Sequence, residues 1–260
     1  MIPSFAALPI LPILSLLPVG AVLGFFGGLF GIGGGIIAIP LLMMVFGMEQ
    51  ATAQGTALVM MVPNLLIAWW RYMRKDARDL KGALGVALVA TVMTGVFAHL
   101  AQRLNSAVML FLFALFLLAL GLNQIHRSRT TRETPPARIT GRWLPLVGIV
   151  SGGSMGLLGI GGGLVATPLF TGLFGKGQRA AQSLALALVT PSAVMALYTY
   201  ADHQRVDWPV GVALGAGGLA TVASGVALAH RWPERTLQRA FGIMLIATAV
   251  VLVVKKAAGL

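Results

Sequence analysis

The sequence predicts an all-α polytopic membrane protein with two homologous repeats, which we expect to be inverted and to contain glycine-broken or re-entrant helices. The first observation is composition: 57% of the 260 residues are hydrophobic and 10% are charged, whereas soluble domains average about 25% charged residues. Apolar stretches such as 107–122 and 210–229 approach the roughly 20 residues that a membrane-spanning helix needs. We therefore expect a multi-pass protein of the cell inner membrane, surrounded by the lipid bilayer.

The positive charge of the chain fits this location better than it fits nucleic-acid binding. The formal net charge is +12, but the Lys and Arg residues lie in short gaps between apolar segments and form no basic face with aromatic residues. That pattern is typical of the cytoplasmic loops of membrane proteins. The chain has no cysteine, which excludes disulfides and Cys-ligated metals. We expect no cofactor, no metal site and no nucleic-acid partner.

The second observation is an internal duplication, because residues 24–79 align with residues 152–207 without a gap. Repeats of this kind are typical of secondary transporters. We expect residues 1–125 to form the first membrane repeat, 126–142 a basic cytoplasmic linker, and 143–260 the second membrane repeat. Positions shared by the two copies include Gly24 with Gly152, Gly31 with Gly159, Pro40 with Pro168, Gln54 with Gln182, Tyr72 with Tyr200 and Asp79 with Asp207.

Each repeat holds about five apolar segments. In the first repeat they lie near residues 10–30, 36–46, 53–70, 83–100 and 107–125. The second segment is too short to span comfortably, so the first two segments either cross twice or form a re-entrant hairpin. The total stays open between ten, if the pair counts as two crossings, and eight, if each hairpin counts as one. In both cases this pair returns the chain to its starting side. Three crossings follow, so each repeat has odd parity and the second repeat is inverted relative to the first.

The Lys and Arg residues favour this inverted arrangement over a parallel one. In the inverted arrangement the basic residues within 71–81, 127–142, 176–179 and 231–239 all lie in the cytoplasm. A parallel arrangement, in which the first two segments cross the membrane once, would move those of 176–179 and 231–239 outside, against the positive-inside rule. The basic residues left outside by inversion are Arg103, Arg205, Lys255 and Lys256.

The third observation is a glycine cluster that occurs in both repeats, as FGIGGG at 30–35 and LGIGGG at 158–163. Consecutive glycines provide no periodic packing face, and they free the backbone to leave the helix. Irregular backbone at membrane depth is tolerated only where protein buries it or where it lines a cavity. A helix that starts after the glycines directs unpaired N–H groups and the positive end of its dipole at one point, which favours an anion. We expect Gly34 and Gly162 to bend away from the helix at the positive φ that alanine disfavours.

Close helix packing is the alternative explanation for some of the glycines. Gly20, Gly24 and Gly28 are spaced by four residues, and the same spacing recurs at positions 148, 152 and 156. This spacing is typical of small-xxx-small contacts between membrane helices. We interpret the spaced glycines as packing positions and the consecutive ones as part of a binding site.

Polar residues follow each glycine cluster. Amides and hydroxyls in hydrocarbon are costly unless they find partners, so each one either bonds a neighbouring helix or binds substrate, and both alternatives stay open for Gln54 and Gln182. No Lys or Arg falls within the core of a segment, so we expect a weak anion site with neutral donors. The candidate substrate-binding residues are Gly33, Gly34, Gly35, Gln50, Gln54, Thr56 and Asn64 in the first repeat and Gly161, Gly162, Gly163, Gln178, Gln182, Ser183 and Ser192 in the second.

Over nearly its whole length the sequence resembles the sulfite exporter TauE/SafE family of membrane permeases, which is related to toluene-sulfonate uptake permeases. The resemblance lies in the glycine-rich stretches 28–35 and 156–163, each followed by Pro and Leu, and in the polar stretches 50–56 and 178–183. It implies a bacterial inner-membrane carrier, not an enzyme, whose substrate is a small sulfur-containing anion such as sulfite or an organosulfonate. Export is the expected direction.

Other functions stay open beside this one. An anion channel and an uptake permease for another small organic anion are the alternatives, and assembly into a homo-oligomer is not decided. The GGSMG stretch at 152–156 fits the G-x-S-x-G motif of serine hydrolases, but that motif needs a strand-to-helix elbow, and its repeat partner carries Phe26 in place of Ser154. Glu49 is the only carboxylate near a segment, so we favour efflux driven by the membrane potential over proton coupling.

Overall fold

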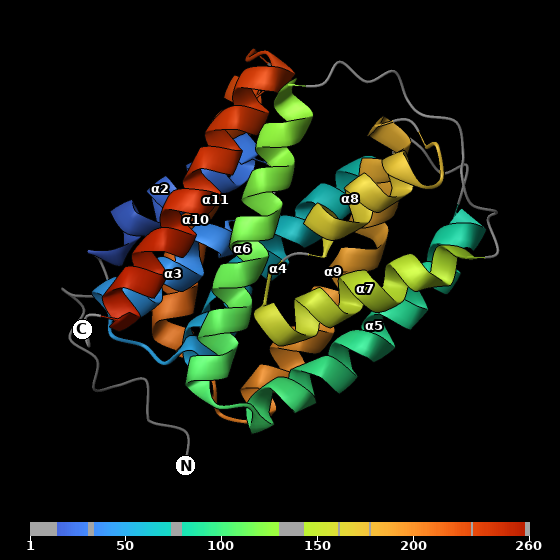
Figure 1. Cartoon of the computed structure of the whole chain (residues 1–260). Helices are drawn as coiled ribbons and strands as arrows, with labels where there is room; N and C mark the ends of the chain where they lie inside the picture. Colours follow the sequence, from blue (N-terminus) through green and yellow to red (C-terminus); the bar gives the residue numbers. More distant parts are fainter. Residues whose placement is uncertain are drawn as a thin grey trace.

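The computed structural model describes residues 15–30, 34–73, 80–129, 143–160, 162–176, 178–229 and 231–257, and within these ranges the chain is helical, without a strand (Figure 1). The predicted all-α class is confirmed, and the five helices described in each half match the five predicted segments. The first half contains α2 (Leu16–Phe30), α3 (Gly35–Val45), α4 (Gln50–Met73), α5 (Leu80–Arg103) and α6 (Ser106–Arg129); the second contains α7 (Leu144–Leu158), α8 (Gly163–Gly172), α9 (Gln178–Asp202), α10 (Trp208–Ala229) and α11 (Glu234–Ala257).

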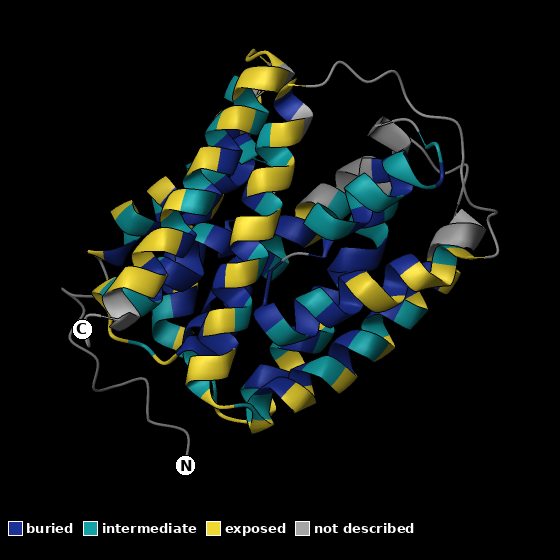
Figure 2. Ribbon diagram, in the orientation of Figure 1, coloured by how far each residue is buried: buried dark blue, intermediate teal, exposed yellow. Residues whose placement is uncertain are grey.

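The surface of the helices indicates a lipid environment. In the part of the chain that the structure describes, four stretches are long and apolar enough to cross a membrane: Leu84–Arg103, Ser106–His126, Leu184–Asp202 and Arg235–Val254. The outward faces of α6 and α11 are exposed over much of their length (Figure 2), and large apolar side chains such as Phe111 are among the exposed ones. Extensive exposed apolar surface marks contact with lipid or a partner rather than with water. The protein is therefore a multi-pass membrane protein.

The two glycine clusters separate short helices. Helix α3, which follows the first cluster, has 11 residues, and helix α8, which follows the second, has 10. At 1.5 Å per residue these helices extend only about 15–16 Å, half of the roughly 30 Å hydrocarbon core. The predicted short second segment of each repeat is thus present, and α3 and α8 cannot cross a membrane alone.

Contacts between the two halves come in corresponding pairs. Helix α2 packs along α10 of the other half, and α7, which occupies the same place in the second half, packs along α5. Helix α6 pairs with α11, and α4 pairs with α9. Figure 1 shows α6 beside α11 and α5 beside α7. Each of these contacts therefore has a counterpart when the halves are exchanged, as expected for duplicated repeats.

The spaced glycines make the α2–α10 and α5–α7 contacts close. A Cβ atom on Gly24 would overlap the backbone of Gly218 on α10, and one on Gly152 would overlap the backbone of Ala90 on α5. A well-packed interface cannot accommodate such a methyl group without moving a helix. The predicted packing role is confirmed for the positions where an added Cβ meets backbone atoms of the facing helix, which are Gly20, Gly24, Gly148, Gly152 and Gly156.

One contact bears directly on the orientation of the halves. Glu49, in the connection between α3 and α4, forms an ion pair with Arg205, in the connection between α9 and α10. Inverted repeats place both connections outside the cell, whereas parallel repeats place them on opposite sides of the membrane. The ion pair therefore supports inversion, which stays a prediction until the sides are measured.

Single-cysteine labelling measures the sides without removal of native thiols, because the chain has no cysteine. Arg129, His203 and Arg231 are exposed, so a cysteine at each position is accessible to a reagent. We expect a membrane-impermeant maleimide added to intact cells to modify His203→Cys, and to leave Arg129→Cys and Arg231→Cys unmodified until the membrane is permeabilised. Modification of Arg231→Cys from outside, together with protection of His203→Cys, would establish parallel repeats instead.

Candidate functional site

The break between α7 and α8 places the start of helix α8 in the interior of the protein. Gly159 ends α7 in the left-handed conformation, with φ 62°, and its N–H donates to the carbonyl of Met155 at 3.0 Å. Helix α8 begins after Gly162, whose carbonyl accepts from the N–H of Ala166 at 2.8 Å. The N–H groups of the first turn have no partner within an α-helix, and no side chain caps them here. The break therefore offers backbone donors and the positive end of a helix dipole.

The equivalent break in the first half has a different backbone. Gly34 precedes α3 in the left-handed conformation, with φ 86°, as predicted. Gly162 has φ −53°, so the expected positive φ at this residue is wrong. Among the described glycines of the second break, Gly159 is the left-handed one. Gly162 is needed for another reason: a Cβ there would lie 2.6 Å from the carbonyl oxygen of Ser151 on α7. Gly33 and Gly161 fall outside the described residues, while Gly35 and Gly163 begin α3 and α8.

Gln54 reaches the second break from the first half. Its side chain is fully buried on α4, and a Cβ on Gly159 would lie 3.1 Å from the Gln54 Cβ atom. Its Oε1 accepts a hydrogen bond of 2.6 Å from the hydroxyl of Tyr200 on α9. Its Nε2 has no hydrogen-bond partner within the described ranges. A buried amide donor without a partner costs free energy, so this end of the amide is available for a ligand.

Ser151 supplies a second buried donor beside the same break. Its hydroxyl is fully buried and without a partner among the residues that the structure describes. The residue packs directly against Gly162, at the start of α8. Gln54 Nε2, Ser151 Oγ and the first turn of α8 thus provide neutral hydrogen-bond donors around the break between α7 and α8.

The other predicted polar residues have no described contact with this break. Gln50 donates through Nε2 to the carbonyl of Met109 at 3.1 Å, and Thr56 accepts from the N–H of Asp207 at 3.0 Å. Ser192 donates its hydroxyl hydrogen to the carbonyl of Leu188 within its own helix, so this hydrogen bond is local to α9. Asn64 is buried, and neither of its amide atoms has a described partner. The remaining predicted residues, Gln178, Gln182 and Ser183, lie on α9, and the structure does not describe their side chains.

Two residues of this arrangement were missed by the sequence analysis. Tyr200 is fully buried and holds the Gln54 amide, and its duplication at Tyr72 is a signal that could have identified it. Ser151 has no such signal, because its repeat position carries Leu23. Its role depends on a backbone approach between α7 and α8 that only the folded structure reveals.

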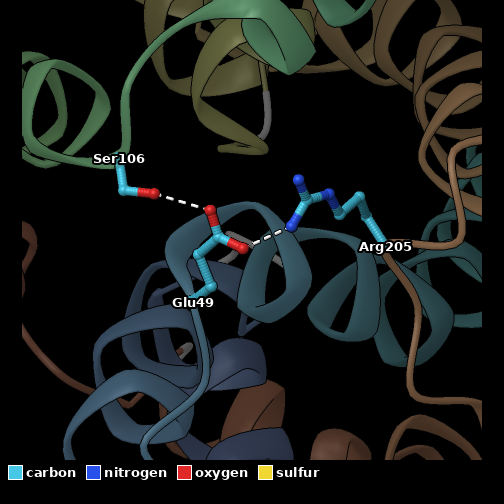
Figure 3. A network of polar contacts seen from close by, with 3 residues as sticks. All are labelled: Glu49, Ser106 and Arg205. Carbon is cyan, nitrogen blue, oxygen red and sulfur yellow. Dashed lines mark hydrogen bonds and ion pairs between the residues drawn. The ribbon is translucent and has the colours of Figure 1, made fainter.

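A polar network lies at the N-terminal end of α4, about one to two helical turns before Gln54. Glu49 accepts a hydrogen bond of 2.6 Å from the hydroxyl of Ser106 and forms an ion pair with Arg205 (Figure 3). The hydrogen bond from Ser106 is the main cause that lowers the pKa of the Glu49 carboxyl, opposed by partial burial and assisted by the charge of Arg205. The network joins the α3–α4 connection, the first residue of α6 and the α9–α10 connection. It therefore links the two halves at one end of the molecule.

A cavity beside α8 is a poorer candidate for an anion. It has a volume of about 470 Å³ and lies between α6 and α8, where Phe116, Leu120, Val165 and Leu169 line it. Asn123 is the only amide side chain among its lining residues. An anion in such a largely apolar space would lose its hydration without gaining enough donors. The polar groups at the α7–α8 break are the better site.

Comparisons with known proteins agree on the kind of protein. The sequence model of the sulfite exporter TauE/SafE family matches residues 16–252. A "Probable membrane transporter protein" of Xylella fastidiosa is 29% identical over 247 residues, which cover 89% of this chain and 91% of that protein. The "Probable membrane transporter protein YunE" of Bacillus subtilis is 24% identical over 255 residues, which cover 89% and 93%. The "Probable membrane transporter protein MJ0441" of Methanocaldococcus jannaschii is 29% identical over 174 residues, which cover 64% of this chain and 63% of that protein.

The Glu49 network predicts a specific pH dependence of stability. Because the pKa of folded Glu49 lies below the ordinary value of 4.5, its ionised form stabilises the fold above that value, and this contribution is lost as the pH falls through the folded pKa. Glu49 and Arg205 are 45% and 36% exposed, so solvent screens the pair and its contribution is at most about 1 kcal/mol. We expect Glu49→Gln to lower the unfolding temperature in detergent at pH 7, and we expect the difference from the parent to disappear as the pH falls through the folded pKa of Glu49, which lies below 4.5.

The matched control is Asp202→Asn, which removes an exposed carboxylate from the end of α9. It should leave the unfolding temperature nearly unchanged at pH 7. An effect of Glu49→Gln that stays the same as the pH is lowered from 7 until the carboxyl of the parent is protonated would show that the ion pair contributes nothing and that only packing was altered.

Proposed function

Because this chain belongs to the sulfite exporter TauE/SafE family, we propose that it is a transporter that exports small sulfur-containing anions, of the sulfite or organosulfonate class, across the bacterial inner membrane. The observation that carries the proposal is the set of unpartnered donors at the break between α7 and α8. Gln54 Nε2 and Ser151 Oγ are buried donors of opposite halves, and each belongs to a residue that packs against a glycine of the break. An oxyanion has several acceptor oxygens that such donors can bind at once.

The donor set accounts for binding that is also reversible. Hydrogen bonds from neutral donors to a charged acceptor contribute about 1.5–3 kcal/mol each, and the start of a partly buried helix adds up to about 2 kcal/mol. No Lys or Arg side chain is part of the donor set. A fixed cation in a buried site would hold the anion more strongly, which a transporter that must release its substrate does not need.

The membrane potential supplies a driving force in the export direction. A cytoplasm that is negative relative to the outside lowers the free energy of an anion by roughly 2.3 kcal/mol per charge and 100 mV as it leaves. In the inverted arrangement the Glu49–Arg205 network lies at the outer end of α4. An anion that leaves the site at this end would pass near the guanidinium of Arg205.

A hydrolase is disfavoured by the local backbone. Ser154 lies within the continuous helix α7, and its hydroxyl donates to the carbonyl of Ser151 at 2.9 Å. A G-x-S-x-G nucleophile stands on a strand-to-helix elbow, which this helical segment does not form. We therefore propose transport without a catalytic serine.

The proposal is tested by counterflow with the purified protein in lipid vesicles. Vesicles loaded with unlabelled sulfite should accumulate labelled sulfite in a saturable manner, and thiosulfate, sulfate and small sulfonates are then ranked as competitors. Gln54→Met keeps the volume of the side chain and removes its donors, so we expect it to raise the apparent KM for sulfite about tenfold or more.

The matched control is Asn123→Leu, which removes the polar group of the cavity between α6 and α8. Its KM should equal that of the parent if the anion binds at the α7–α8 break. A higher KM for Asn123→Leu with an unchanged KM for Gln54→Met would move the site into the cavity. Conductance without counterflow would establish a channel, and the absence of any sulfite flux would contradict the proposed substrate.

A further inference from the structure

We propose that Tyr200 is the positioning residue of the anion site, and that its hydroxyl fixes the orientation of the Gln54 amide so that the site presents N–H donors rather than an acceptor. This inference rests on the proposed function, because it concerns the same site. Tyr200 belongs to α9 in the second half and Gln54 belongs to α4 in the first. The hydrogen bond between them is therefore also a link between the halves.

The length of the bond indicates which end of the amide faces the tyrosine. The hydroxyl oxygen lies 2.6 Å from Gln54 Oε1. O–H···O bonds have typical lengths of 2.7–2.8 Å, whereas N–H···O bonds are longer, at about 2.9–3.0 Å. The short contact thus fits an amide oxygen that accepts from the tyrosine. The carbonyl oxygen of Gly156, at 3.1 Å, is the more distant of the two acceptors near the single phenolic proton.

The consequence of this orientation lies at the other end of the amide. With Oε1 bound by the tyrosine, the two N–H groups of Nε2 form the free end, which has no partner in the described part of the chain. An amide that could rotate by 180° would present its oxygen to the ligand for part of the time, and an oxygen repels an oxyanion. Tyr200 removes that alternative before the substrate arrives, which is preorganisation of the site.

The apolar surroundings of Tyr200 indicate that its hydroxyl has a specific role in the fold. Tyr200 is among the largest fully buried side chains, and it packs among apolar residues such as Ala196 and Ala193 of its own helix. A buried hydroxyl is costly unless it is bonded, and phenylalanine would fill the same volume without that cost. The hydroxyl adds two contacts to acceptors, the shorter one to Gln54 and the longer one to the carbonyl of Gly156.

The test is a double-mutant cycle in sulfite counterflow, with KM and the maximal rate measured separately. We expect Tyr200→Phe to raise the KM threefold to tenfold and to leave the maximal rate within twofold of the parent. In a Gln54→Met background, Tyr200→Phe should change neither value, because the amide that it orients is gone. Tyr198→Phe is the matched control, because Tyr198 lies on the same helix, is 67% exposed, and should leave the KM unchanged.

The outcomes separate this inference from the proposed function. A parent protein without saturable sulfite flux, or a Gln54→Met variant with the KM of the parent, contradicts the proposed site and the inference with it. A raised KM for Gln54→Met beside a parental KM for Tyr200→Phe overturns the inference alone. If Tyr200→Phe does not fold, the double variant of Tyr200→Phe and Gln54→Met tests the positioning role instead, because it leaves no amide oxygen unpaired. A KM of the double variant above that of Gln54→Met would show that Tyr200 acts independently of Gln54 and would overturn the positioning role.

Discussion

A helix that breaks inside a membrane leaves backbone groups that lipid cannot satisfy, so protein must surround the break. In this protein the need is met by close contacts of the helices that carry the breaks. Gly24 on α2 lies against Gly218 on α10, and Gly152 on α7 lies against Ala90 on α5. These contacts bring helices of opposite halves around each break, and the fold can therefore keep the uncapped starts of α3 and α8 in its interior.

The same constraint explains why the proposed site is shared between the halves. The start of α8 and Ser151 come from the second half, and the amide of Gln54 comes from the first. A donor from the opposite half reaches the break only while the halves are packed together. A relative movement of the halves would then change the number of donors around an anion, which is what alternating access of a carrier requires.

Local features of the sequence predicted the helices, the breaks and the packing glycines, because hydropathy, glycine and proline act over short distances. The spacing of Gly24 and Gly152 was enough to predict a close helix contact. Partners across the fold were not predictable, because no spacing indicates that Gln54 meets Gly159 rather than the glycines of its own half. The backbone at Gly162 differs from expectation for a related reason: the glycine there is required by the nearby carbonyl of Ser151 and not by a positive φ.

The central claim, that an oxyanion binds between the break of the second half and an amide of the first, is tested most directly by a structure with bound anion. Selenite has the shape and charge of sulfite, and its selenium can be located by anomalous scattering. We expect one selenium site within hydrogen-bond reach of Gln54 Nε2 and of the first-turn N–H groups of α8. A selenium site at Arg205 or in the cavity beside α6, with Gln54 Nε2 still unpaired, would contradict this account.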